Sequence, residues 1–212
     1  MSEIKISYSE FFRETIAYAI LEQVILPQIV KKKRVEREIR IWSAGCANGQ
    51  EAYSMAILLS DLIESSGRNI RFRIFATDIS EEALINGRAG VFSENAVQNV
   101  KVKHLNKYFI KEGKSYTVIP KLKQYIHFAN YDLLDRSTIN LPESIYGDFD
   151  IVICGNVLIY YKEDAQKAII NKLLLAMAED GYLVVGETEK FLVENATKLQ
   201  VVNPNTSVFK MG

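Results

Sequence analysis

Three polar residues stand where strands are expected to end or where a glycine turn begins a helix. Asp78 and Asn156 closely follow apolar stretches, and Glu51 follows a turn bracketed by Gly45 and Gly49. A carboxylate accepts two hydrogen bonds, so Asp78 suits the paired hydroxyls of a ribose; alternatively, it only caps the next helix. Because the carboxyl ends of parallel strands meet at one edge of a sheet, these residues predict a nucleoside-binding site there.

The stretch 39–51 reads as a strand, a glycine turn and the start of a helix, which is the first unit of a nucleotide-cofactor fold. The turn has the spacing Gly-x-x-x-Gly and lacks both the dinucleotide fingerprint and the P-loop pattern, so phosphate binding is not indicated. Glycines still let the backbone approach a ligand closely, because they carry no Cβ. We therefore expect a nucleoside cofactor without phosphates, for which S-adenosylmethionine (SAM) fits; the alternative is an ordinary glycine turn in an α/β protein.

The remaining periodicity predicts an α/β fold with one doubly wound, mostly parallel sheet. Strands are expected from Ile39, over 72–77, 125–129, 149–154 and 182–185, and in an antiparallel terminal hairpin at 199–202 and 207–210. Helices are expected from Gln50 to about Ile63, from the N-cap Ser80 to about Arg88, over 100–108, and from Glu163 to Ala178 with Gly181 as the stop. A hairpin signal around 112–114 predicts a small β insertion, and such insertions often serve recognition.

The N-terminal residues predict a further helix that ends near Val30. Ser9 is placed to cap it, and at least one of Phe11 and Phe12 is expected in the core. One face of this helix is expected to carry Phe12, Ile16, Ile20 and Val24, with Leu21 and Ile25 beside it.

The composition argues against several classes of function. Lys plus Arg and Asp plus Glu both number 26, so no net charge favours nucleic acid or an anionic membrane as the main partner. The two cysteines and two histidines lack the spacing of metal ligands. No apolar run reaches the roughly 18 residues of a membrane span, and no signal peptide is visible, so we expect a soluble, cytoplasmic protein.

Several motifs, in the same order along nearly the whole chain, together resemble the CheR-type chemotaxis receptor methyltransferases. The matching segments are Ser9–Arg13, Trp42–Cys46, Glu51–Ser54, Ala76–Ile79, Asp132–Leu134, Cys154–Tyr160 and Gly186–Glu189. The resemblance implies a Rossmann-like class I SAM-dependent methyltransferase that forms methyl esters on glutamates of the cytoplasmic helices of chemoreceptors and releases S-adenosylhomocysteine (SAH).

The same resemblance places the active site on residues of these motifs. Arg13 and Tyr160 are expected nearest the transferred methyl group and are the candidate catalytic residues. No metal site is expected. The candidate cofactor-binding residues are Ser9, Arg13, Ala44, Gly45, Glu51, Asp78, Asp132, Leu133, Gly155 and Asn156.

The chain departs from the family pattern at three places. A helical N-terminal domain usually precedes the Phe-Phe-Arg motif, whereas only a few residues precede that motif here. Gly155 stands where the family usually has Arg, and Asp132 stands where it usually has Asn. We expect residues 1–38 to form an N-terminal helix that covers the cofactor site, and residues 39–212 to form the methyltransferase domain with a β insertion at about 100–124.

The implied reaction requires little acid–base chemistry. A glutamate with a pKa of about 4.3 is ionised near neutral pH, so its oxygen can displace the methyl group in line without a general base. Arg13 is expected to hold the substrate carboxylate and Tyr160 to orient it; the alternatives are a surface ion pair and an amphipathic core tyrosine. Glu51 is expected to face the cationic end of SAM, or else to be a first-turn acid favoured by the helix dipole.

Two other functions remain open on the sequence alone. The departures from the family pattern are compatible with a SAM-binding regulatory module that has lost turnover, or with a methyltransferase for another protein or a small molecule. The short hairpin turn at 112–114 predicts a member that does not dock on a receptor tail peptide and uses instead a groove lined by Arg13 and the N-terminal helix. The basic run Lys31–Arg34 with Arg37 is expected to be a solvated linker, with docking of an acidic partner as the alternative.

Overall fold

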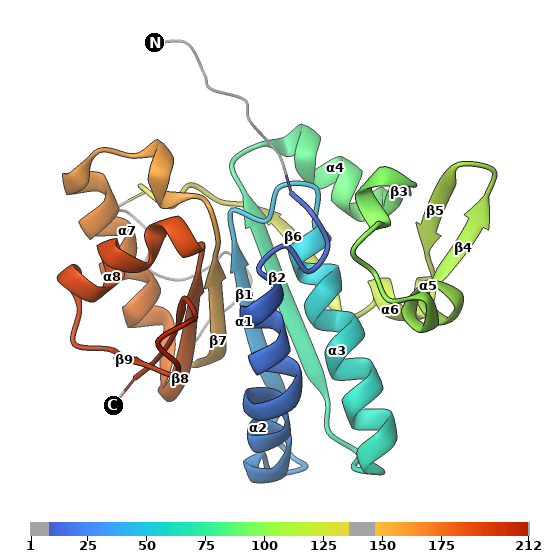
Figure 1. The fold of residues 1–212 in the computed structure, drawn as a ribbon, viewed down its shortest axis with the longest axis horizontal. Helices are drawn as coiled ribbons and strands as arrows, with labels where there is room; N and C mark the ends of the chain where they lie inside the picture. Colours follow the sequence, from blue (N-terminus) through green and yellow to red (C-terminus); the bar gives the residue numbers. More distant parts are fainter. Residues whose placement is uncertain (1–8, 136–146, 212) are drawn as a thin grey trace.

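The computed structural model describes residues 9–135 and 147–211. A sheet of seven strands in the order β6-β2-β1-β7-β8-β10-β9 forms its centre (Figure 1). β10 runs antiparallel to both β8 and β9, whereas β6, β2, β1, β7 and β8 pair in parallel with their neighbours in that order. The strands are β1 Ile39–Ala44, β2 Phe72–Asp78, β6 Ile126–Asn130, β7 Phe149–Cys154, β8 Met177–Val185, β9 Gln200–Val201 and β10 Val208–Lys210. The expected doubly wound, Rossmann-like sheet with an antiparallel terminal hairpin is confirmed.

Helices cover both faces of this sheet. Side chains of β1 alternate between the faces: Ile39 and Ile41 join one buried apolar cluster, and Trp42 and Ala44 join another. The first cluster includes α1 and α2, which follow each other along one axis, and α3, which lies beside them (Figure 1); the second cluster includes α7 and α8. The helices are α1 Thr15–Ile20, the π-helical turn η1 Leu21–Ile25, α2 Leu26–Lys32, α3 Gln50–Ser66, α4 Glu81–Ala89, α5 Val102–Tyr108, α6 Pro120–Lys123, α7 Glu163–Ala176 and α8 Lys190–Ala196, with 3-10 turns η2 Asn95–Val97, η3 Leu158–Tyr160 and η4 Glu187–Glu189.

The N-terminal helix begins later than predicted. Glu14 occupies the N-cap of α1, and Phe12 has a φ of 52°, which no helix allows, so the prediction that Ser9 caps the helix is wrong. Tertiary packing explains the difference. Phe11 is 0% exposed and packs edge-on against Phe92, with ring centroids 4.9 Å apart, and the N–H of Phe12 donates to Ser54 Oγ at 3.1 Å.

The predicted apolar face of that helix is wrong in part. Ile16 and Val24 are exposed, whereas Leu21 and Ile25, predicted beside that face, are buried, and Ile20 is partly buried against the core. The buried side chains of this helical segment are Ala17, Tyr18, Leu21, Ile25, Leu26, Ile29 and Val30. Period counting therefore found the spacing of this helix but placed its buried face one position too early.

The boundary between α7 and β8 differs from the prediction in a similar way. α7 ends at Ala176, and β8 begins at Met177, which pairs with Phe149 across an irregularity in β7. Gly181 lies inside the strand and does not stop the helix. A Cβ there would lie 2.8 Å from the carbonyl oxygen of Ala178, so close backbone packing explains this glycine.

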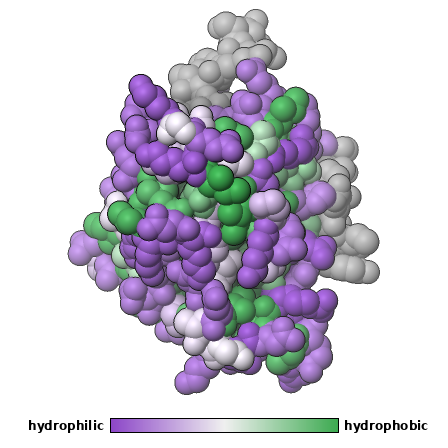
Figure 2. Space-filling model, turned by 90° about the vertical axis from the view of Figure 1, so that its right-hand side faces the viewer, coloured by the Kyte–Doolittle hydropathy of each residue, from purple (hydrophilic) through white to green (hydrophobic). Residues whose placement is uncertain are grey.

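A second, three-stranded antiparallel sheet in the order β3-β5-β4 lies beside α4 and α5 (Figure 1). The predicted hairpin is present as β4 Phe109–Glu112 and β5 Ser115–Val118, whereas the third strand, β3 Val91–Ser93, was not predicted. Figure 2 shows this side of the molecule as polar with scattered apolar patches, and its exposed apolar side chains include Val91 and Ile110. Three residues are too few for a period-two pattern to mark β3.

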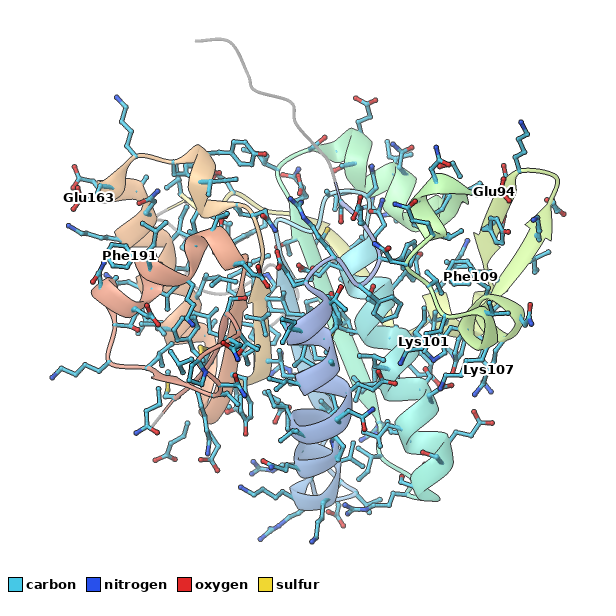
Figure 3. All side chains as sticks on the ribbon, in the orientation of Figure 1. Glu94, Lys101, Lys107, Phe109, Glu163 and Phe191 are labelled. Carbon is cyan, nitrogen blue, oxygen red and sulfur yellow. The ribbon has the colours of Figure 1, made fainter. Side chains whose placement is uncertain are left out.

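Charged groups tie α5 and the second sheet to the rest of the fold. Asp61 on α3 accepts hydrogen bonds from the Tyr108 hydroxyl at 2.6 Å and from Lys107 Nζ at 2.7 Å. Lys101 Nζ binds Glu22 of the N-terminal helical segment at 2.7 Å. Figure 3 shows Lys101 and Lys107 at this junction. α5, which leads directly into β4 of the second sheet, is therefore held against both α3 and the helical segment that precedes β1.

Candidate cofactor-binding and active site

A cavity of about 580 Å³ opens at the carboxyl ends of β1, β2 and β7. This is the edge at which the strand order reverses, where open α/β sheets bind ligands. The segment that leads into α1 lies over these strand ends (Figure 1) and forms part of the wall. The predicted site residues that line the cavity are Ser9, Arg13, Gly45, Glu51, Asp78, Leu133, Gly155, Asn156 and Tyr160.

The two remaining predicted residues, Ala44 and Asp132, are not among those that line the cavity. Ala44 is 0% exposed and packs in the apolar cluster between the sheet and the helices α7 and α8. The Asp132 Oδ1 accepts a hydrogen bond from the backbone N–H of Leu134 at 2.8 Å, which fixes the turn after β6. Both are adjacent in sequence to cavity residues, and sequence motifs do not separate a wall residue from its neighbour.

The glycine turn after β1 is shaped by close packing. Gly45 and Gly49 have φ values of 76° and 85°, a region that glycine reaches without strain. A Cβ on Gly45 would lie 2.5 Å from Val157 Cγ2, so a larger residue would displace the loop after β7. The N–H of Gly45 donates to the carbonyl of Thr77 at 2.8 Å. The turn therefore brings the ends of β1, β2 and β7 together around the cavity.

Asp78 links two of these segments through its carboxylate. Its Oδ2 accepts from the N–H of Ala47 at 2.8 Å, and its Oδ1 accepts from the N–H of Ser80 at 2.9 Å. The side chain that caps α4 is Ser80, whose Oγ accepts from the N–H of Ala83. Each carboxylate oxygen has a second lone pair, so Asp78 retains the capacity to bind the hydroxyls of a ligand.

Glu51, in the cavity wall, has a carboxyl with a raised pKa. Burial raises the pKa of its carboxyl from 4.5 to about 7, and the negative charges of Glu189 and Glu14 add to the increase, whereas the Ser43 hydroxyl opposes it. Ser43 Oγ donates to Glu51 Oε1 at 2.5 Å. A positive ligand group beside Glu51 would offset the cost of ionising it in this place.

Gly155 leaves space next to that acid. A Cβ built on Gly155 would meet Glu51 Oε2 at 3.3 Å and otherwise only the backbone N of Gly186 at 3.9 Å. The wall at Gly155 is therefore formed by backbone, and the charge that borders it is the carboxylate of Glu51.

Arg13 and Tyr160 lie at more exposed positions of the same cavity. Tyr160 is 48% exposed, so the alternative of a core tyrosine is wrong. It ends the 3-10 turn η3, which follows Asn156, and Asn156 Nδ2 donates to Glu14 Oε1 at 3.3 Å. The loop after β7 and the segment before α1 thus meet across the opening. Tyr160 lies on the loop after β7, and Arg13 lies on the segment before α1.

The described lining of the cavity carries more acidic than basic residues. Among the described residues that line the cavity, Arg13 is the basic one, and the acidic ones are Glu10, Glu14, Glu51, Asp78, Glu81 and Glu82. Such a lining attracts a cationic ligand. Within the described part of the chain, no three His, Cys, Asp or Glu residues are grouped as metal ligands.

Comparison with known proteins identifies the family. The family model described as "CheR methyltransferase, SAM binding domain" matches residues 7–208. The chain belongs to the CheR methyltransferase family. Its cofactor is SAM, a nucleoside with a cationic sulfonium, which agrees with the acid-rich cavity.

Individual relatives support this assignment. A chemotaxis protein methyltransferase of Borreliella burgdorferi is 32% identical over 212 residues, covering 97% of this chain and 71% of that protein. The chemotaxis protein methyltransferase of Salmonella typhimurium is 30% identical, covering 85% of this chain and 59% of that one. An uncharacterized 104.1 kDa protein of Rhodobacter capsulatus is 33% identical, with 88% of this chain matching 19% of its length. The chain therefore corresponds to a part of each relative.

Two features of the CheR site were not predicted. Cys46, Tyr18, Tyr131 and Tyr161 line the cavity, and the sequence offered no periodic or motif signal for the tyrosines. Glu189 is fully buried and binds the loop after β7, although its motif gave it no predicted role.

Glu51→Gln is expected to remove a pH dependence of SAM binding. Because the pKa of Glu51 is raised to about 7, its ionised fraction, and with it the affinity for cationic SAM, should rise between about pH 6 and pH 8. The folded-state pKa lies above the ordinary value of 4.5, so the stability of the cofactor-free protein falls as pH rises from about 4.5 to about 7, and it stays at the lower level above that range. Glu51→Gln should therefore also raise the melting temperature at about pH 8.

Calorimetric titration with SAM and thermal unfolding without it measure both effects. Glu163→Gln, at the exposed start of α7 (Figure 3), serves as the control. An affinity that does not vary with pH in the wild type, or that varies equally in Glu51→Gln, would contradict this role.

Proposed function

We propose that the protein transfers the methyl group of SAM to glutamate side chains of chemotaxis receptors, forming methyl esters. The observation that carries this proposal is the match of residues 7–208 to the CheR family, together with relatives named chemotaxis protein methyltransferases. The geometry of the cavity agrees with it, since the half-buried acids Glu51 and Asp78 line it while Arg13 and Tyr160 are more exposed.

The inner residues suit the cofactor. Asp78 binds the ribose hydroxyls, Glu51 faces the cationic end, and Leu133 and Asn156 form walls of the same cavity. Ser9 and Gly45 complete the wall from the segment before α1 and the turn after β1. When bound, SAM supplies a methyl group on a positively charged sulfur that leaves as a neutral thioether.

The outer residues suit the substrate. A glutamate carboxylate is ionised near neutral pH, so its transfer chemistry needs orientation and no general base. Arg13 holds that carboxylate with its planar guanidinium, and it also offsets the repulsion from the acidic lining. Tyr160 orients the attacking oxygen through its hydroxyl. Placing the two reactants in line can contribute roughly 7–11 kcal/mol to such a reaction.

Incubation with methyl-labelled SAM and receptor cytoplasmic fragments tests the function. The label should appear on fragments with glutamate at the acceptor positions, be absent from fragments with alanine there, and be released by mild base, as esters are. Binding of SAM with no transfer to any receptor would favour the SAM-binding regulatory module, and transfer to another acceptor would favour a different substrate.

Arg13→Ala and Tyr160→Phe should each lower kcat by more than about tenfold while SAM affinity stays within about threefold, because both act on the substrate side. Labelled transfer and calorimetry measure the two quantities. Arg71→Ala, which removes an exposed arginine before β2, is the control. Equal losses in SAM affinity and rate would make the two residues cofactor ligands, and full activity would exclude the mechanism.

We further propose that receptor recognition does not depend on a tail peptide. The β4–β5 hairpin turns through only Gly113 and Lys114, which leaves a short edge for adding a peptide strand. The acidic helices of the substrate would then reach the site through the groove beside Arg13 and the N-terminal helix, with the basic run at 31–34 adding a salt-sensitive attraction.

Methylation of receptor fragments with and without their terminal tail should therefore proceed at rates within about threefold of each other, and both should fall at high salt. Initial rates at low and high ionic strength measure this. Activity that collapses when the tail is deleted would show that the second sheet docks the tail.

The division of the chain is part of the same proposal. Residues 1–38 act as a cover over the cofactor site, and 39–212 form the catalytic domain with an inserted β unit. Among the described helices, none is long and apolar enough to cross a bilayer. A cytoplasmic location follows from the proposed substrate, because the glutamates to be methylated lie on the cytoplasmic part of receptors.

A further inference from the structure

Glu189 is a buried acid that the proposed mechanism does not use. It ends the turn η4 after β8, and it is 0% exposed. Its Oε2 accepts from the backbone N–H groups of Gly186 at 2.9 Å and Asn156 at 2.8 Å, and its Oε1 accepts from the N–H of Ile159 at 3.3 Å. One carboxylate therefore ties the end of β8 to the loop that follows β7.

That loop presents two candidate site residues to the cavity. Asn156 has a φ of 60°, in the left-handed region, which Asn adopts more readily than most residues with a Cβ. η3 begins at Leu158 and ends at Tyr160. Glu189 binds the N–H of Asn156 itself and that of Ile159, one residue before Tyr160. Both side chains line the cavity, so the carboxylate sets the backbone from which they project.

The chemistry of the contact explains why an acid stands at this position. A carboxylate offers about four acceptor positions on two oxygens, enough for all three N–H groups. Hydrogen bonds to an ionised acceptor are roughly twice as strong as neutral ones. A glutamine keeps one acceptor oxygen and turns an NH2 donor toward the remaining N–H, whereas an alanine leaves every one of these N–H groups without its partner.

We propose that Glu189 is a positioning residue, which through its hydrogen bonds to the loop after β7 sets Asn156 for the cofactor and Tyr160 for the substrate. The Tyr160 part rests on the proposed receptor methylation. The Asn156 part requires only that the cavity binds SAM or SAH.

Glu189→Gln tests the Tyr160 part, because its remaining oxygen still accepts from Gly186 and Asn156 and its NH2 group faces the N–H of Ile159. We expect kcat to fall by more than about tenfold per folded molecule, with SAH affinity within about threefold of the wild type. Glu187→Gln, exposed in the same turn, is the matched control and should change neither value.

A double-mutant cycle separates positioning from general stability. In a Tyr160→Phe background, Glu189→Gln should lower kcat by less than about threefold, since the hydroxyl through which it acts is already gone. Equal losses in both backgrounds would overturn the route through Tyr160. A lower melting temperature with unchanged kcat per folded molecule would make the role of Glu189 structural only.

A second cycle needs no methyl acceptor. Glu189→Ala should weaken SAH binding by more than about tenfold, and by less than about threefold in an Asn156→Ala background. This cycle distinguishes failure of the positioning role from failure of the proposed function, because it holds whatever the substrate is. Independent losses in the two backgrounds would overturn the inference.

Hydrogen exchange on the wild-type protein provides a measurement that does not depend on the folding of a variant. The amide protons of Asn156 and Ile159 should exchange as slowly as those of the core strands, although they lie in a loop. Fast exchange at both would show that Glu189 does not hold the loop.

Discussion

The parallel pairing of β1 with β2 on one side and with β7 on the other is the constraint on which the site depends. The three chain segments that leave these strands emerge at one edge of the sheet, where the strand order reverses. They carry the glycine turn, Asp78 and the loop with Asn156 and Tyr160. Hydrogen bonds then hold these segments: Asp78 after β2 binds Ala47 after β1, and Glu189 after β8 binds Asn156 after β7. The cavity is therefore a consequence of strand order, and its chemistry is a consequence of a few residues placed just after the strands.

The sequence predicted the parts of this arrangement that local patterns determine. The apolar runs predicted β1, β2 and β7, and the polar residues after them predicted Asp78, Asn156 and Glu51 in one site. What it missed depends on contacts between distant segments. The N-terminal helix starts after Phe12 because Phe11 inserts beside Phe92, and the helix turns Ala17 and Tyr18, instead of Ile16, toward the core. β3 is too short to show a period. The contact between Glu189 and the loop after β7 joins segments far apart in the sequence, so no local pattern indicates it.

The cavity combines opposing electrostatic demands. Burial of Glu51 near Glu14 and Glu189 raises the pKa of Glu51 and lowers the stability of the empty protein at neutral pH. The same acids favour a cationic cofactor, which offsets that cost when it binds. A negatively charged substrate is repelled by the acidic lining at the opening. Arg13 is the basic residue that the described lining provides against this repulsion. The acids that favour the cationic cofactor thus lower the stability of the cofactor-free protein, a trade-off that is common at functional sites.

The affinity of Asp78→Ala for SAH tests the central claim, that the cofactor lies at the carboxyl ends of β1, β2 and β7, most directly. Calorimetry on the folded variant should show a loss of more than about tenfold, or about 1.4 kcal/mol, relative to the wild type. Asp164→Ala, at the exposed first turn of α7, should bind as the wild type does. Unchanged affinity in Asp78→Ala would contradict the account, because it would show that the cofactor does not contact the carboxylate that links the ends of β1 and β2.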